Sequence, residues 1–239
     1  DHYHKVLEAR PADPAAIFML QSLGGVSMPD AAPVEHVRRI FDRCAGTFEK
    51  VLVQDLEYRT PELLFDLVRP YLSEAMNVLD LGCGTGLGAE QYRPFAKRLT
   101  GIDASPKMLE RAREKGVYDR LQAVDILQGW AFPEMFDLIY SSDVFVYFGN
   151  LDPIFRPLSS HLALGGSLAF SVEWLADDSE DYRLCPTGRY AHSATYLEER
   201  LREHGLKVMA MTEANIRKQS GEPVKGLLLV AKKDVGMDA

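Results

Sequence analysis

Glycine occupies every second position of a short loop that follows an apolar run. The run ends in Val-Leu-Asp-Leu, with Asp80 as its acid, and Gly82, Gly84 and Gly86 come directly after it. Glycine has no Cβ and readily adopts positive φ, so this loop lets the backbone approach a ligand closely. We expect a helix from about residue 87, whose first N–H groups point at the same place. The pattern predicts a site for a nucleotide-like ligand.

Two further carboxylates end the next two apolar runs. Asp103 is placed to accept hydrogen bonds from both hydroxyls of a ribose. Asp125, with Ile126 after it, is placed to flank or hydrogen-bond an adenine. Between these acids, Ser105 is the expected N-cap of a helix that begins with Pro106. A glycine loop, an acid, a capped helix and a second acid therefore follow one another in the order that an adenosine-containing ligand requires.

These motifs resemble those of the class I S-adenosylmethionine-dependent methyltransferases. The resemblance is carried by DLGCGTG at 80–86, GIDASPKM at 101–108, DI at 125–126, FDLIYSSD at 136–143 and LGG at 164–166. The chain is more narrowly similar to the small-molecule branch that includes the ubiquinone and menaquinone biosynthesis enzymes. It also resembles predicted bacterial methyltransferases that are fused to tetratricopeptide repeats, through YRTPELL at 58–64 and PTGRYAHS at 186–193.

Apolar periodicity predicts an α/β fold. We expect strands near 76–81, 98–103, 120–125, 136–142 and 166–173, helices near 87–96, 106–116, 151–164 and 194–204, and a closing strand pair near 206–217 and 224–233. The resemblance makes this a doubly wound, seven-stranded, mostly parallel sheet. It also implies a methyltransferase domain over 33–239, with a helical lid over 33–72. Residues 1–32 are expected to form a helical extension similar to the remnant of a tetratricopeptide array.

The resemblance implies S-adenosyl-L-methionine as the cofactor and S-adenosyl-L-homocysteine as its product. The expected cofactor-binding residues are Asp80, Gly82, Cys83, Gly84, Thr85, Gly86, Asp103, Ala104, Met108, Asp125, Ile126, Ser141, Tyr58, Arg59 and Phe48. The reaction expected is direct in-line transfer of a methyl group to an unidentified small-molecule acceptor, with no covalent enzyme intermediate.

Residues at the ends of later strands are candidates for the acceptor side. His192, in the loop expected before the helix near 194–204, is the candidate general base because imidazole titrates near neutral pH. Tyr190 of the same loop and Asp143, after the strand near 136–142, are the further catalytic candidates. The expected acceptor-binding residues are Tyr147, Glu173 and Arg189. The Arg189 guanidinium suits a carboxylate or a phosphate.

Other ligands and functions fit this sequence less well. A nicotinamide loop has the pattern GxGxxG, but the sixth position counted from Gly82 is Leu87. Counted from Gly84, the pattern is met by Gly86 and Ala89 but lies two positions too far from the strand. An aminopropyltransferase needs a carboxylate pair for its polyamine, which is not evident. A cofactor-binding regulatory or scaffold module, docking a protein through the N-terminal helices, and a protein methyltransferase remain alternatives.

Composition narrows the class of protein. The 239 residues contain 35 acidic and 27 basic side chains, a net charge of −8, without a basic run, which disfavours a nucleic-acid partner. Three scattered cysteines fit a reducing cytoplasm, where we expect the protein to reside. The sequence contains no CxxC pair and no His/Cys cluster, so we expect no structural zinc site. No apolar stretch approaches the roughly 18 residues of a membrane span.

Overall fold

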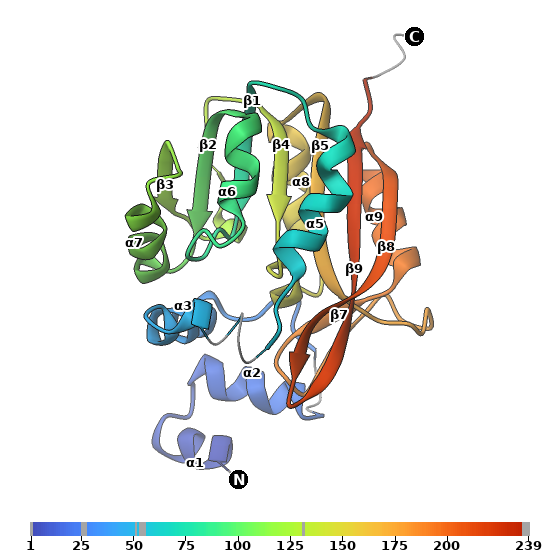
Figure 1. Cartoon of the computed structure of the whole chain (residues 1–239). Coiled ribbons are helices and arrows are strands. Elements are labelled where there is room, and N and C mark those ends of the chain that lie inside the picture. The colour runs from blue at the N-terminus through green and yellow to red at the C-terminus, as the bar shows by residue number, and fades with distance from the viewer. Residues whose placement is uncertain (1, 25–27, 51, 53–55, 131, 236–239) are drawn as a thin grey trace.

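A single twisted sheet with helices on both faces forms the centre of the protein (Figure 1). The computed structural model describes residues 2–24, 28–50, 52, 56–130 and 132–235. Within these residues the sheet contains β1 (Met76–Leu81), β2 (Ala96–Asp103), β3 (Arg120–Ala123), β4 (Phe136–Ser141), β5 (Leu162–Trp174), β6 (Tyr182–Leu184), β7 (Tyr190–His192), β8 (Leu206–Gln219) and β9 (Glu222–Lys233). The predicted α/β class is confirmed.

The strand order places β1 and β2 side by side between β3 and β4. The order is β3-β2-β1-β4-β5-β7-β6, and β9 runs antiparallel between β5 and β8. Strands β1 to β5 are parallel, so their carboxyl ends meet at one edge. In the register of β1, Asp80 lies opposite Gly101 of β2 and Tyr140 of β4. The acids that end these strands are thereby brought to one place.

The sheet has two more strands than the seven that we predict, because β6 and β7 form a short hairpin. The hairpin pairs Tyr182 with His192 and Leu184 with Tyr190. From the sequence we expect a loop over 188–193, before the helix near 194–204. Tyr190 and His192 are instead fully buried, and their burial in the core makes the hairpin part of the sheet.

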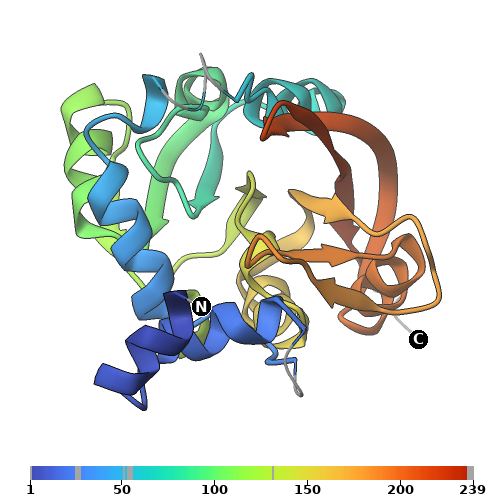
Figure 2. The same cartoon turned by 90° about the horizontal axis from the view of Figure 1, so that it is seen from below.

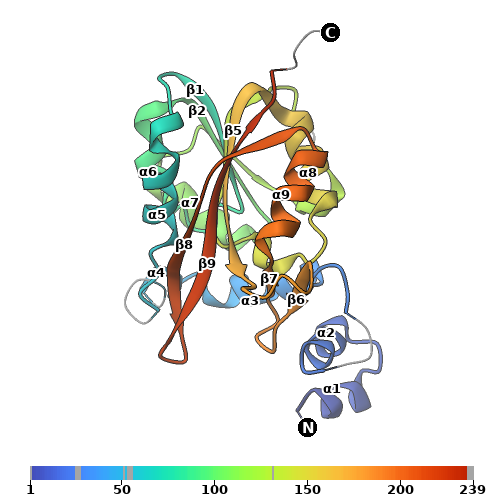
Figure 3. The ribbon, with the colours of Figure 1, turned by 90° about the vertical axis from the view of Figure 1, so that its right-hand side faces the viewer.

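Helices cover the two faces of the sheet. They are α5 (Thr60–Val68), α6 (Ala89–Tyr92), α7 (Pro106–Lys115), α8 (Asp152–His161) and α9 (Ala194–Glu203). Figure 3 shows α5 and α6 on one face and α8 and α9 on the other. Alternate residues of β1 enter different cores, with Val78 facing α5 and Leu79 facing α8, as strand geometry requires.

The helix predicted over 87–96 is much shorter than expected. Helix α6 has four residues and passes into the 3₁₀ turn η3 (Arg93–Phe95). Pro94 lies in that turn, and a proline there has no N–H to continue the helix and clashes with the preceding turn. The prediction for α7 is confirmed, because Ser105 Oγ accepts a hydrogen bond of 3.2 Å from Met108 N at its N-terminus.

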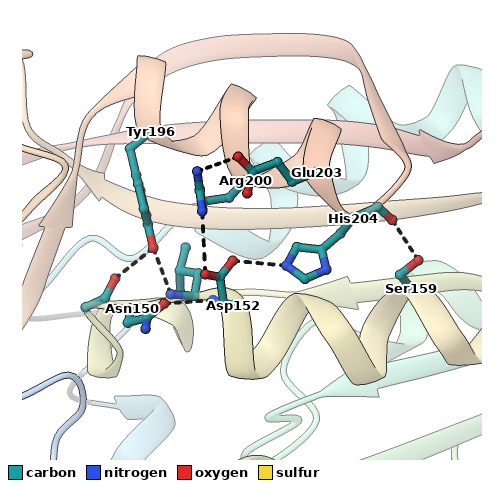
Figure 4. Close-up of polar contacts among 9 residues, drawn as sticks. Asn150, Asp152, Ser159, Tyr196, Arg200, Glu203 and His204 are labelled. Carbon is teal, nitrogen blue, oxygen red and sulfur yellow. Dashed lines mark hydrogen bonds and ion pairs between the residues drawn. The ribbon is translucent and has the colours of Figure 1, made fainter.

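Polar contacts fasten α9 to the start of α8 (Figure 4). The Tyr196 hydroxyl accepts a hydrogen bond of 2.9 Å from Leu151 N and donates one of 3.4 Å to Gly149 O. His204 Nε2 lies 3.0 Å from Asp152 Oδ1. These contacts fix the turn over 148–151, which directly follows residues of the candidate site.

The N-terminal helices lie beyond the carboxyl edge of the sheet (Figures 1 and 2). They are α1 (His2–Ala9), α2 (Pro14–Ser22), α3 (Val34–Cys44) and the short α4 (Phe48–Lys50). The predicted lid over 33–72 divides into two parts, because α5 packs on the sheet through Leu64 and Val68 while α3 and α4 cover the edge. Residues 1, 25–27, 51 and 53–55 of the predicted extension and lid lie outside the described residues.

Candidate active site

A cavity opens at the carboxyl ends of the parallel strands, beneath α3 and α4. The space between its walls, counted together with the open mouth, is about 1170 Å³. Its lining includes Val37, Phe41, Phe48 and Tyr58 from the N-terminal part, the glycine loop with Leu87 and Gly88, Asp103, Ala104, Asp125, Ile126 and Leu127, and Ser142, Asp143, Val144, Tyr147, Phe148 and Arg189.

The glycine loop has the backbone conformation that its sequence predicts. The φ angles of Gly82, Gly84 and Gly86 are 75°, 53° and 77°, all in the left-handed region. A Cβ on Gly82 would lie 2.3 Å from Val144 Cγ2, and one on Gly86 would lie 2.8 Å from Tyr118 Cε2. The glycines are therefore needed for packing beneath the loop as well as for its turns.

Asp103 ties the glycine loop to the next helix. Its Oδ2 accepts a hydrogen bond of 2.9 Å from Gly84 N, and its Oδ1 accepts one of 2.7 Å from Ser105 N. Burial raises the pKa of this carboxyl to about 6, and the backbone hydrogen bonds limit the rise. The carboxylate is held rigidly at the end of β2, with its position fixed from both sides.

Two tyrosines orient Asp80 at the end of β1. Tyr118 and Tyr140 each donate a hydrogen bond of 2.6 Å to Asp80 Oδ2. Burial raises the pKa of this carboxyl to about 7, although both hydrogen bonds favour the charged form. Both tyrosines donate to the same oxygen of a carboxyl that lines the cavity.

The segment over the cavity is joined to the sheet domain by polar contacts. Ser105 Oγ donates a hydrogen bond of 2.6 Å to Asp42 of α3, and Thr85 Oγ1 donates one of 2.6 Å to Glu49 of α4. The Phe41 ring packs edge-on against Tyr147 with 5.8 Å between the ring centroids. These contacts close one side of the cavity with aromatic and aliphatic side chains.

A buried ionic cluster borders the other end of the cavity. Arg217 of β8 donates a hydrogen bond of 2.6 Å from Nη1 to Asp143 Oδ1. Its Nη2 donates another to Glu173 Oε1. Asp143 has φ of 59°, a conformation that costs energy for a non-glycine residue and often marks functional sites. Arg189 Nη1 lies 3.9 Å from Glu173 Oε1, and the charge of Arg189 lies close to the Tyr147 phenol.

The cavity brings together most of the predicted site residues. Lining it are Asp80, Gly82, Cys83, Gly84, Thr85, Asp103, Ala104, Asp125, Ile126, Phe48, Tyr58, Asp143, Tyr147 and Arg189. Four predicted cofactor residues lie outside the lining. Gly86 packs on Tyr118, Met108 is buried in α7, Ser141 Oγ donates to Leu81 O, and Arg59 forms an exposed ion pair with Glu62.

The position of His192 does not support the prediction that it is the general base. The ring is fully buried outside the cavity lining, and Nε2 lies 2.8 Å from Phe148 O and 3.2 Å from Gly149 O. Desolvation lowers the pKa of His192 to about 4, so the imidazole is neutral and Nε2–H donates to these carbonyls. His192 supports the turn that carries Tyr147 and Phe148.

Tyr190 and Glu173 are also displaced from their predicted roles. The Tyr190 hydroxyl donates a hydrogen bond of 2.6 Å to Pro29 O, and its ring packs with Phe18 of α2. Tyr190 therefore fastens the N-terminal segment to the sheet. Glu173 lies behind the cavity wall, where Arg217 holds it.

Sequence reasoning missed three residues that organise the site. Tyr118 and Tyr140 hold Asp80, and Arg217 holds the acids at the opposite end. A tyrosine in or beside a strand is most simply interpreted as core. Arg217 lies 74 residues from Asp143, and no local pattern connects the two. In the described part of the chain, no cluster of His, Cys, Asp and Glu has a metal-binding arrangement. No helix there is long and apolar enough to cross a membrane.

Comparison with protein families identifies the domain. Residues 55–211, which contain strands β1 to β5, match the family model of the methyltransferase domain. The chain belongs to this family. The resemblance predicted from the motifs is thereby confirmed.

Individual relatives of this methyltransferase cover part or all of the fold. It is 30% identical over 146 residues to a malonyl-[acyl-carrier protein] O-methyltransferase of Erwinia pyrifoliae, a match that covers 61% of this chain and 54% of the relative. The chain thus matches about half the length of that curated relative.

Solved structures with the same fold extend the comparison. The [4+2]-cyclase SpnF has a TM-score of 0.69 at 20% identity and covers 87% of this chain and 98% of its own. The N-methyltransferase NodS of Bradyrhizobium japonicum, in complex with S-adenosyl-L-homocysteine, has a TM-score of 0.60 at 24% identity. The match covers 92% of this chain and 99% of NodS. At these identities the likeness concerns the fold alone.

Proposed function

We propose that this methyltransferase transfers the methyl group of S-adenosyl-L-methionine to a small-molecule acceptor by direct in-line displacement. The main support is one arrangement: the left-handed glycine loop, with Asp103 bonded to Gly84 N, beside Asp80 in a single cavity. Bound in this cavity, the cofactor would supply a methyl group that is already activated by the sulfonium.

Three of the four acids that line the cavity hold the cofactor under this proposal. Asp103 binds the two ribose hydroxyls, and Asp125 with Ile126 borders the adenine ring. Asp80 and the N–H groups of the glycine loop hold the methionine part. Phe48 and Tyr58 cover the cofactor and exclude water from the reacting methyl group.

A small acceptor is favoured by the walls of the remaining space. Phe41 and Tyr147 pack against one another there, with Arg189 and Asp143 beyond them. The name of the Erwinia relative describes methylation of an oxygen of a malonyl group that is attached to an acyl-carrier protein. The enzyme's task at this end is to align the acceptor with the S–CH₃ bond.

Transfer of isotope tests this proposal. The protein is incubated with methyl-labelled S-adenosyl-L-methionine and a small-molecule metabolite extract, and in parallel with a desalted protein extract. We expect label in the small-molecule products. Label only in protein would identify a protein methyltransferase, and cofactor binding without transfer to either extract would identify a regulatory module.

A further inference from the structure

The cavity has an unusual balance of charged groups. The lining contains the carboxyl groups of Asp80, Asp103, Asp125 and Asp143, and among the described lining residues Arg189 is the only cation. Three of these acids lie in the half proposed to bind the cofactor. Only Asp143 and Arg189 lie where the acceptor must be placed.

The acids beside the acceptor space already have a cationic partner. Arg217, whose side chain is 1% exposed, hydrogen-bonds to both Asp143 and Glu173. A buried guanidinium placed between two carboxylates satisfies their charge and accounts for their burial. An ammonium group on the acceptor would have to compete with Arg217 for these oxygens, so the cluster is poorly suited to binding a cationic acceptor.

Arg189 is differently placed. Its Nη1 lies 3.4 Å from Gln219 Oε1, its distance of 3.9 Å from Glu173 is too long for a hydrogen bond, and its side chain is 25% exposed. Its charge also lies close to the Tyr147 phenol. A guanidinium has five N–H donors, and these contacts use a minority of them. The remaining donors form the geometry that binds a carboxylate through two parallel hydrogen bonds.

The acceptor end of the described lining, away from Asp80, Asp103 and Asp125, also lacks a group suited to remove a proton from the acceptor. It contains no histidine or lysine. Burial raises the pKa of the Tyr147 phenol, so that it stays protonated, and Asp143 is engaged by Arg217. An alcohol or an ammonium group must lose a proton to react, whereas a carboxylic acid is already ionised at neutral pH. A carboxylate therefore needs only binding and alignment.

We propose that the methyl acceptor is a carboxylate, bound by Arg189 and converted to its methyl ester. This inference rests on the proposed function. One carboxylate oxygen forms the new O–CH₃ bond with its electron pair, the S–CH₃ bond breaks, and the bonding pair stays on sulfur. No proton moves and no oxidant is needed. An anion and a sulfonium become a neutral ester and a neutral thioether, so the product loses its charge-assisted attraction to Arg189.

The chemical stability of the transferred label tests the inference. Methyl-labelled cofactor and a small-molecule extract are incubated with the enzyme, and the products are treated with mild base. A methyl ester releases labelled methanol, whereas methyl groups on nitrogen, carbon or an ether oxygen stay attached. We expect base-labile label, and pretreatment of the extract with a carbodiimide and an amine, which converts carboxylates to amides, should abolish it.

Variants connect this label to Arg189. With the purified acceptor, Arg189→Gln should lower kcat/KM by about 10- to 100-fold, mainly through KM, and Arg189→Lys should recover part of the loss. Arg183→Gln is the matched control, because Arg183 lies in the same hairpin but forms an exposed ion pair with Glu180. Affinity for S-adenosyl-L-homocysteine should stay within about twofold in all three variants, which establishes an intact cofactor site.

Base-stable label, or equal kcat/KM in Arg189→Gln and Arg183→Gln, would overturn the carboxylate inference and leave methyl transfer in place. Absence of any labelled product from an enzyme that binds S-adenosyl-L-homocysteine would contradict the proposed function itself, and the inference with it.

Discussion

The Tyr118 hydroxyl donates a hydrogen bond of 2.6 Å to Asp80 Oδ2, beneath the glycine loop that its ring also supports. Tyr140 donates to the same oxygen, while Cys83 and the charge of Asp103 lie nearby. The hydrogen bonds from the two phenols favour the charged form of Asp80. Burial and the charge of Asp103 disfavour it.

Tyr118→Phe should move the pH dependence of cofactor binding. Loss of one hydrogen bond to the charged form raises the pKa of Asp80 above its value of about 7. Affinity for S-adenosyl-L-homocysteine, which falls as Asp80 is protonated, should then fall at a pH about one unit higher than in the wild type. Calorimetric titrations between pH 6 and 9 measure this shift.

Tyr92→Phe is the control for that experiment. Tyr92 stacks on Tyr140 with 3.7 Å between the ring centroids, but its buried hydroxyl has no hydrogen-bond partner in the described part of the chain. Its loss should leave the pH profile unchanged. A profile that moves equally in both variants would show that packing, and not the hydrogen bond to Asp80, controls the titration.

His192→Ala should lower stability without removing a catalytic base. The substitution leaves a cavity and two carbonyls without their donor, which we expect to lower the free energy of unfolding by about 2–4 kcal/mol. Denaturant unfolding measures this loss, with the exposed His4→Ala as the control. Loss of the acid limb from the pH profile of kcat/KM, at unchanged stability, would restore His192 as the base.

Acid should destabilise the wild-type protein through the same histidine. The unfolded chain protonates His192 near its ordinary pKa of about 6.5, whereas the folded protein does so only at about 4. The unfolded state therefore binds more protons between these values, so stability falls as the pH decreases from 6.5 to 4, by up to ~3 kcal/mol. In His192→Ala, the free energy of unfolding measured against pH should lack this loss between pH 6.5 and 4.

Arg217→Met should destabilise the protein strongly. Removal of a buried cation leaves Asp143 and Glu173 with an uncompensated charge, and we expect a loss of about 3–5 kcal/mol in the free energy of unfolding. Lys218→Met removes the neighbouring cation, whose ion pair with Glu57 is exposed, and should cost less than about 1 kcal/mol. Similar losses in the two variants would refute the bridging role of Arg217.

Local sequence patterns predicted the geometry of the glycine loop and of Asp103 because local structure builds it. Asp103 lies at the end of its strand and bonds to Ser105 two residues later, so motif and geometry coincide. The helix after the glycine loop was predicted too long, because periodicity took precedence over Pro94. The β6–β7 hairpin was missed, since its pairing depends on tertiary burial of Tyr190 and His192.

The acceptor half could not be predicted in the same way. It is assembled from residues far apart in the chain, as the contact between Asp143 and Arg217 illustrates. His192 was assigned by residue type and loop position, yet its neighbours are carbonyls from the segment after β4. Which atom an imidazole faces is a property of the packed sheet and not of the sequence around it.

The central claim is that the cavity binds S-adenosyl-L-methionine through the carboxylate at the end of β2. Its most direct test is calorimetric titration of the wild type and of Asp103→Ala with S-adenosyl-L-homocysteine. We predict one site per chain in the wild type and an affinity about 10- to 100-fold weaker in the variant, because two charge-assisted hydrogen bonds to the ribose are lost. Absence of binding to the wild type, or equal affinity in both proteins, would contradict the account.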